Sequence, residues 1–444
     1  MPTQCFPLGL LALSAGAPGA LFTLSTPGAP ECGVTVSAPE FEVEGEPRSG
    51  FHFTGRAVER PLVRGGRELA LYYESPGSPA LELVVMVRSY PQSPILRFRY
   101  ALRAEGPVHL TKREGRDRLR YFGLSGWPAG QVSLADIQLS HFDPVLHSYL
   151  PCPVDYRPEE LYEGQRLAGP IVLLHDAHAS LLVAYEHGAD HPHSFFDYVV
   201  HPEAGALVLS AQQGNYHGGQ ALPFESVWFE LGLVCGPREA LLERYRRFFL
   251  EEICENLGSR EPLLFYNTWN YQERQRYFHG RPYLESMNLE RMLAEIDVAH
   301  RIGIDVFVID TGWYSKTGDW VVDPGRFPDG LQAVRRRLHG YGMRLGLWFN
   351  PTVAARTSRI YREHPEFAMT RGGQPPRWHE IWETEESTGM CLASDYADHG
   401  APARRAGRDL LQVGRRRPVG VRLAPAQSRW VRQPARGARG LLRL

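Results

Sequence analysis

Lysine is nearly absent from this 444-residue chain, and so are long apolar runs and grouped cysteines. Lys112 and Lys316 are the only lysines among 49 basic residues, a usage that suggests a GC-rich gene. No stretch reaches the ~18 consecutive apolar residues of a membrane-spanning helix, which excludes a helical membrane protein. The six cysteines show no disulfide or metal-site spacing, so we interpret them as core thiols.

Positive charge is missing from the N-terminus. The segment CFPLGLLALSAGAPGALF is apolar like a secretory signal, but no Lys or Arg precedes Arg48. A signal peptide begins with a basic segment. We therefore predict a first β-strand here and a cytoplasmic protein.

Acidic residues are missing from the other end. Residues 399–444 contain 12 arginines and a single acidic residue, Asp409. This segment is dominated by Ala, Gly, Pro and Arg and has no stable helix or strand period. Three interpretations fit it: an out-of-frame translation, which we rank first, a disordered basic tail, or a nucleic-acid-binding arm.

The chain before this tail divides by its hydrophobic periodicity. Residues 1–236 alternate β-branched or aromatic runs with Pro/Gly/Ser turns, which predicts a β-sandwich. Residues 237–262 begin with PREALLERYRRFFLEEI, whose apolar side chains recur at helical spacing. We predict a linker helix there.

Residues 263–398 alternate strands and helices, which is typical of a (β/α) barrel. We predict strands at 263–269, 306–309 and 345–349, helices at 284–303, 330–339 and 358–367, and a further short strand at 390–394. A complete barrel has eight such units, so the predicted barrel is incomplete.

Polar and aromatic residues follow the strands of this region. Side chains at the carboxyl ends of barrel strands face the site, so we expect Asp310, Trp313, Trp320 and Trp348 to share one pocket. A carboxylate accepts sugar hydroxyl protons, and an indole covers a sugar ring. Other interpretations are a helix N-cap for Asp310, a core role for Trp320, and a plain loop role for Asp319.

Two clusters of ionisable residues suggest sites but have simpler interpretations. We interpret the first as a solvated loop rather than a metal site, because no Cys or Glu completes the set; it comprises His187, Asp190, His191 and His193. We interpret the second as a solvated acidic run; it comprises Glu380, Glu383, Glu385 and Glu386.

Several motifs occur together in the barrel region. They are NTW (267–269), DTGW (310–313), GDWVVDPGRFPDGL, GMRLGLWFNP and YREHPEF. In this order and spacing they resemble family 36 glycoside hydrolases, the bacterial α-galactosidases, over roughly Leu263 to Asp398. The resemblance implies a multidomain β plus α/β protein, with an N-terminal β-supersandwich followed by an incomplete (β/α)8 TIM-type barrel.

The resemblance also implies roles for individual residues. Trp269 matches a tryptophan lining the sugar subsite, Asp310 a carboxylate that binds galactose hydroxyls, and Trp348 an indole facing the sugar. Two positions depart from the family pattern, because Thr311 replaces a second Asp and Asn350 replaces an acidic residue. Both can form hydrogen bonds without charge, so a related α-linked sugar such as N-acetylgalactosamine stays open.

The nucleophile of the resembled family is absent. That family carries it as the Asp of a K-W-D motif on the next strand, and this chain has no K-W-D. One consistent codon choice for Asp409 to Arg415 reads, one nucleotide later, Thr-Tyr-Phe-Lys-Trp-Asp. We therefore predict a frameshift between about Asp398 and Asp409, which puts the missing Asp near Gly414.

The expected function of the intact protein follows from the resemblance. It would hydrolyse terminal α-galactosides of small oligosaccharides with retention, without metal or cofactor, and without a nucleic-acid or membrane partner. Family members often form homo-oligomers. A catalytically inactive sugar-binding remnant is the alternative for the chain as written.

Overall fold

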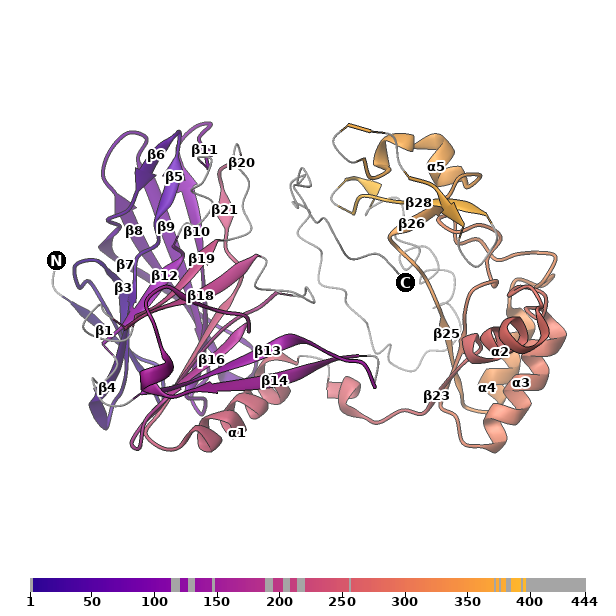
Figure 1. Cartoon of the computed structure of the whole chain (residues 1–444), viewed down its shortest axis with the longest axis horizontal. Coiled ribbons are helices and arrows are strands. Elements are labelled where there is room, and N and C mark those ends of the chain that lie inside the picture. Colours follow the sequence, from indigo (N-terminus) through magenta and orange to yellow (C-terminus); the bar gives the residue numbers. More distant parts are fainter. Residues whose placement is uncertain are drawn as a thin grey trace. The chain divides into compact units, whose positions relative to one another are not determined.

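The computed structural model divides into two compact units, Met1–Glu255 and Asn256–Leu444 (Figure 1). It describes residues 3–112, 120–126, 132–145, 148–187, 195–202, 208–213, 220–254, 257–370, 373–374, 377–380, 385–392 and 394–396. The predicted tail at 399–444, with Gly414 in it, lies outside these residues.

The first unit is built from antiparallel sheets, as predicted for residues 1–236. Its eight-stranded sheet runs β1 (Gln4–Pro7), β2 (Ala12–Ala15), β3 (Ala20–Thr26), β4 (Ala29–Ser37), β12 (Phe122–Ser125), β19 (Val208–Gln213), β18 (Phe196–His201) and β15 (Gln165–Leu167). β1 and β2 occupy the apolar N-terminus, which confirms the predicted strand there.

A larger sheet faces it. This sheet runs β14 (Ser148–Tyr156), β13 (Ser133–Asp143), β16 (Ile171–His175), β17 (Ser180–Tyr185), β22 (Phe229–Val234), β10 (Ile95–Ala104), β9 (Leu81–Ser89), β8 (Arg67–Ser75) and β7 (His52–Pro61), with β21 (Phe224–Glu225) also on β10. A small sheet joins β20 (Gln220–Ala221), β11 (His109–Leu110), β5 (Phe41–Val43) and β6 (Glu46–Arg48). The connections between strands include the 3-10 turns η1 (Val63–Gly65) and η2 (Pro158–Glu160).

Aromatic side chains join the two large sheets. Along β10, Leu96, Phe98 and Tyr100 are fully buried while the arginines between them are not, because successive strand residues point to opposite faces. The Phe98 ring lies 5.4 Å from Phe22 on the opposite sheet and 5.3 Å from Phe122. This alternation is the pattern from which the sandwich was predicted.

Helix α1 (Arg238–Phe248) packs on the outer face of the larger sheet. Its Leu241, Tyr245 and Phe248 form a cluster with Ile95 and Leu182. It continues into the π-helical turn η5 (Phe249–Ile253), and the 3-10 turn η6 (Leu257–Arg260) follows. The helix predicted in the linker 237–262 is therefore part of the first unit, which ends at Glu255.

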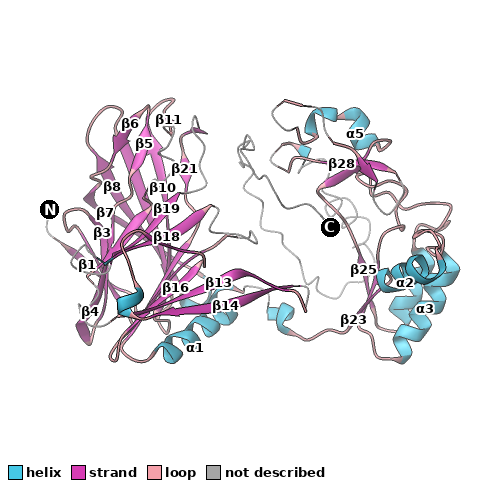
Figure 2. Ribbon diagram, in the orientation of Figure 1, coloured by secondary structure: helices cyan, strands magenta, loops and turns pink. Residues whose placement is uncertain are grey.

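The second unit contains a parallel sheet in the order β23 (Phe265–Asn267), β24 (Val306–Ile309), β25 (Arg344–Leu347). Helices α3 (Leu289–Arg301) and α4 (Gln332–Gly340) supply Ile296, Val334 and Leu338, which pack with Phe307 and Ile309 of β24. Helices α3 and α4 lie on one side of this sheet (Figure 1, Figure 2). Parallel strands joined by helices are the expected (β/α) barrel arrangement.

Two local features of this unit differ from prediction. A helix, α2 (Trp269–His279), follows β23 directly where we predicted none. The strand predicted at 390–394 is wrong: β28 (Glu386–Gly389) ends before it and pairs antiparallel with β26 (Val353–Ala355) and β27 (His379–Glu380). The Cys391 amide instead donates to the Phe367 carbonyl. The short helix predicted at 358–367 is present as α5 (Arg359–Glu363) and the 3-10 turn η7 (Pro365–Phe367).

Within the residues that the structure describes, no helix is long and apolar enough to cross a membrane.

Candidate functional site

Three polar or aromatic residues lie at the carboxyl ends of the three parallel strands. Asn267 ends β23, Asp310 follows β24, and Trp348 follows β25. Because the strands are parallel and neighbouring, these ends meet at one edge of the sheet. The Trp348 amide donates to the Ile309 carbonyl over 3.0 Å, which places Trp348 beside Asp310 in the register.

Asp310 is a buried and firmly held carboxylate, only 5% exposed. Its Oδ2 accepts a 2.9 Å hydrogen bond from Asn267 Nδ2, and its Oδ1 accepts a 2.7 Å bond from the Thr311 amide. Burial raises the pKa of Asp310, although the bonds from Thr311 and Asn267 act in the opposite direction. Asp310 caps no helix, because α4 starts only at Gln332 and is preceded by Leu331.

Trp269 lies at the start of α2, beside the same strand ends. Its amide donates to Asn267 Oδ1 over 2.8 Å, so Asn267 bonds both Trp269 and Asp310. The half-buried indole stacks on the Tyr283 ring at 4.9 Å. Asn267 and Tyr283 were not predicted as site residues; the NTW motif contained the signal for Asn267.

The other tryptophans divide between the site edge and the core. Trp313 is 1% exposed and its indole N–H donates to the Trp348 carbonyl over 2.9 Å. Trp320 is 6% exposed and belongs to the same core cluster, which supports the core interpretation made for it. Trp348 is half-buried against that cluster, so Trp348 and Trp269 are the two of these indoles that keep exposed surface.

Thr311 and Asn350, the two positions that depart from the pattern of the resembled family, both form hydrogen bonds within the chain. Thr311 is fully buried, with its hydroxyl 2.7 Å from the Tyr314 hydroxyl. Asn350 Oδ1 accepts from the Thr352 amide at 3.2 Å and from its hydroxyl at 2.8 Å. The structure therefore brings Asp310, Trp348 and Trp269 to one edge, with Thr311 below the surface.

Buried contacts fix the backbone around Asp310. Gln272, which was not predicted, donates through Nε2 to the carbonyls of Thr311 and Tyr283, each over 3.0 Å. Gly312 has a φ of +102°, and a Cβ there would lie 2.8 Å from Leu284 Cδ2. The third residue of DTGW must therefore be glycine for both conformation and space.

The acidic residues of the nearby loops have structural partners. Asp319 accepts from the first amides of α5, Arg359 at 2.8 Å and Ile360 at 3.0 Å, so it is a loop residue that caps a helix. Glu380 is exposed as predicted, but Glu385 is not simply solvated, because it forms a 2.6 Å ion pair with Lys316. Glu386 pairs with Arg356 at 2.6 Å, and Glu383 lies outside the described residues.

The loop from His187 to His193, which we interpreted as solvated rather than metal-binding, is only partly described by the structure. His187 stacks on Phe195 at 4.6 Å, and burial lowers its pKa. Asp190, His191 and His193 lie outside the described residues. Among the residues that are described, no group of three or more His, Cys, Asp or Glu is arranged to hold a metal ion.

The barrel region of this chain is similar in sequence to known glycoside hydrolases. Residues 259–380 match the melibiase family. An α-galactosidase of Lactobacillus acidophilus is 34% identical over 96 residues, which is 20% of this chain and 13% of that protein. An A type blood α-D-galactosamine galactosaminidase of Flavonifractor plautii is 32% identical over 93 residues, 20% of this chain and 9% of that protein.

A similar fold occurs in a family 36 α-galactosidase of Geobacillus stearothermophilus whose structure was solved in complex with raffinose. The TM-score is 0.64 at 12% identity, and the match covers 93% of this chain and 64% of that one. The chain therefore spans less than two thirds of these relatives. The melibiase segment contains the three strand ends at which Asn267, Asp310 and Trp348 meet. Residues 259–380 of this chain are therefore similar to the melibiase family and to α-galactosidases.

Proposed function

We propose that the second unit binds the terminal galactose of a small soluble α-galactoside, of the melibiose or raffinose type. The observation that carries this proposal is the buried Asp310 carboxylate, held by Asn267 at the edge where Trp348 and Trp269 also lie. A carboxylate at such an edge accepts hydroxyl protons, and half-buried indoles offer an apolar surface to a sugar ring.

The reaction proposed for the intact protein is hydrolysis with retention of configuration. That mechanism needs two carboxylates about 5–5.5 Å apart, one as nucleophile and one as acid/base, and water as the second substrate. Asp310 is a binding residue in this scheme. The nucleophile is the Asp of the shifted reading frame, encoded across the Gly414 and Arg415 codons. The chain as written therefore binds sugar without cleaving it.

A second α-linked sugar is also supported. The replacement of the second family Asp by Thr311 and the similarity to the Flavonifractor plautii α-D-galactosamine galactosaminidase favour a galactose with a nitrogen substituent, either galactosamine or N-acetylgalactosamine, as the alternative ligand. We further propose that the protein acts in the cytoplasm and that the intact form is a homo-oligomer.

Two experiments test these proposals separately. Isothermal titration of the full chain with D-galactose and N-acetyl-D-galactosamine tests the site, and binding of neither overturns it. Resequencing the gene from the Met390 codon onward tests the frame. An added or missing base before the Asp409 codon, with Lys-Trp-Asp restored downstream, supports a hydrolase. A confirmed frame leaves a sugar-binding remnant, which releases nothing from a chromogenic α-galactoside.

A further inference from the structure

The loop that follows Asp310 folds back on itself as a narrow hairpin. Tyr314 and Val322 form an antiparallel bridge, and the Ser315 amide donates to the Val321 carbonyl over 2.8 Å. At its tip, the Lys316 carbonyl accepts from the Trp320 amide over 3.3 Å. The backbone of Lys316 therefore holds the backbone of Trp320 in place, and the Trp320 side chain packs into the core.

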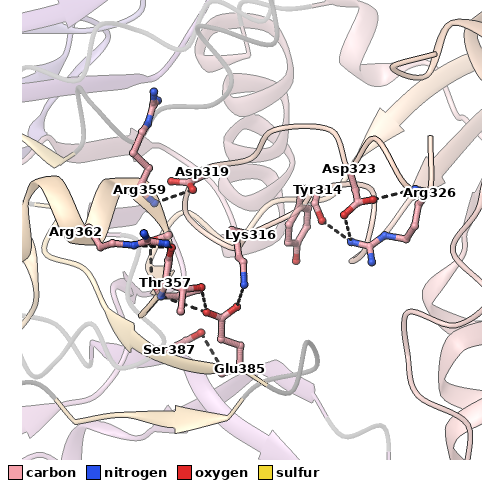
Figure 3. A network of polar contacts seen from close by, with 12 residues as sticks. Tyr314, Lys316, Asp319, Asp323, Arg326, Thr357, Arg359, Arg362, Glu385 and Ser387 are labelled. Atoms are coloured by element: carbon pink, nitrogen blue, oxygen red, sulfur yellow. Dashed lines mark hydrogen bonds and ion pairs between the residues drawn. The ribbon is translucent and has the colours of Figure 1, made fainter. Parts of the chain in front are cut away.

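Three contacts tie this tip to the segment that follows β25. Lys316 Nζ lies 2.6 Å from Glu385 Oε2. The Thr317 carbonyl accepts from the Ala355 amide over 3.0 Å, and the Asp319 carboxylate caps α5. Figure 3 shows Lys316 and Thr357 both directed at the Glu385 carboxylate, with Asp319 at the start of α5.

Glu385 is the centre of these contacts. Its Oε1 accepts from the Thr357 hydroxyl and from the Thr357 amide, the latter over 3.2 Å, while Oε2 accepts from Lys316. The Glu385 side chain is 19% exposed and that of Lys316 is 41% exposed, so the pair is partly shielded from water. Burial alone would raise the pKa of Glu385, but the bonds from Lys316 and Thr357 outweigh it and lower the pKa.

The tip also contacts the candidate site through tryptophan. The Trp320 ring packs edge-to-face on Tyr314 at 4.5 Å and on Trp348 at 6.3 Å. Trp348 is the indole at the end of β25, beside Asp310. A displacement of the tip would therefore shift the ring on which Trp348 rests.

We propose that Lys316 and Glu385 are positioning residues, which hold the hairpin tip so that Trp320 supports Trp348 in the orientation that binds galactose. The inference rests on the proposed function and extends it to two residues that do not touch the sugar. An ion pair suits this role because it joins the hairpin that follows β24 to the start of β28, two segments that are 69 residues apart in sequence.

The test compares four variants of the full chain. Lys316→Met and Glu385→Gln break the ion pair, Lys316→Arg keeps the charge, and Arg356→Gln is the matched control. Arg356 forms an equally short 2.6 Å pair with Glu386, but that pair joins the residue after β26 to β28 and includes no residue of the hairpin. Titration calorimetry gives the D-galactose Kd, and hydrogen exchange of residues 311–322 measures how readily the hairpin tip opens.

We expect Lys316→Met and Glu385→Gln to weaken galactose binding at least roughly 5-fold, the lower range of couplings between separate sites. Exchange at the tip should become faster in the same two variants. Lys316→Arg should retain binding within about 2-fold, and Arg356→Gln should match the wild type in both readouts. Rescue by arginine separates a positional role from a general loss of stability, and the melting temperature of each variant checks folding.

The outcomes are distinct. Unchanged galactose affinity in Glu385→Gln and Lys316→Met overturns the positioning role, whether or not tip exchange changes. Equal weakening in Arg356→Gln also overturns it. A wild-type chain that binds no galactose overturns the proposed function itself, and the positioning role with it. If hydrogen exchange at the hairpin tip is nevertheless faster in Lys316→Met and Glu385→Gln, the ion pair stabilises the loop and has no part in sugar binding.

Discussion

Asn267 and Asp310 lie 43 residues apart in sequence, and the Asn267 amide group donates to Asp310 Oδ2 over 2.9 Å. The same Asn267 side chain accepts from the Trp269 amide. One residue thus sets the positions of both the carboxylate and the start of the helix that carries the Trp269 indole. Asn267 is therefore a supporting residue of the candidate site.

The first prediction concerns the carboxylate. Asp310→Asn removes the charge and turns an amide toward Asn267, so galactose binding should weaken by about 2 kcal/mol, or roughly 30-fold. Titration calorimetry measures it. Asp297→Asn is the control, because Asp297 is part of an ion pair with Arg337 outside the candidate site. Equal affinity of Asp310→Asn and the wild type would remove Asp310 from the site.

The second prediction concerns the buried amide of Gln272. In Gln272→Leu the carbonyls of Thr311 and Tyr283 lose this donor, which should lower the free energy of unfolding by about 1–3 kcal/mol. Urea unfolding measures it. The exposed Gln332→Leu on α4 should change stability by less than about 0.5 kcal/mol. A loss of similar size at both positions would show that the Gln272 bonds contribute little.

The third prediction separates strain from crowding at Gly312. Gly330 also has a positive φ, +65°, but nothing lies within 4 Å of the Cβ that alanine would add there. Gly330→Ala should therefore cost about 1–2 kcal/mol from conformation alone. Gly312→Ala should cost about 1–3 kcal/mol more, because its methyl also meets Leu284 and Met287. Thermal unfolding of the two variants gives the difference, and equal losses would exclude the crowding.

The fourth prediction is a pH dependence of stability in the first unit. Burial raises the pKa of Glu252, in η5 after α1, to about 7. Burial also raises the pKa of Glu230, which lies below α1, accepts from the Tyr245 hydroxyl and faces Glu186 and Arg97. Folding therefore takes up protons. The stability from each group is complete below its unfolded pKa of about 4.5 and is lost as pH rises toward the folded value.

Unfolding measured at several pH values between 5 and 8 checks this prediction. The wild type should lose stability with rising pH, and Glu252→Gln should flatten part of that slope. Glu243→Gln, on the exposed side of α1, should leave the slope unchanged. A wild-type stability that rises over this interval would contradict the assignment.

The strongly periodic elements could be predicted from the sequence. β9, β10 and β24 are runs of β-branched and aromatic residues, and Asp310 was found because an apolar strand ends in a charge. Helix α2 was missed because its sequence, WNYQERQRYFH, is polar on nearly every face, and Gln272 is its only buried residue. Periodicity carries no signal for such a helix.

The supporting residues of the site were missed for a different reason. Asn267 and Gln272 act through hydrogen bonds to residues 43 and 39 positions away, which exist only once the strands are side by side. Trp313 and Trp320 were expected at the pocket, but a tryptophan after a strand can turn inward as easily as outward. The burial of these two rings depends on the hairpin fold of residues 313–323, which sequence spacing does not specify.

The separate hydrophobic core of the first unit has a consequence during synthesis. All of its strands and α1 precede Glu255, so the sandwich can fold while the second unit is still being translated. At ~5–20 residues per second, the roughly 90 residues up to the end of β25 take about 5–20 s to add. The strands of the parallel sheet can therefore emerge after the sandwich has folded, and the order of translation then limits the wrong partners available to them.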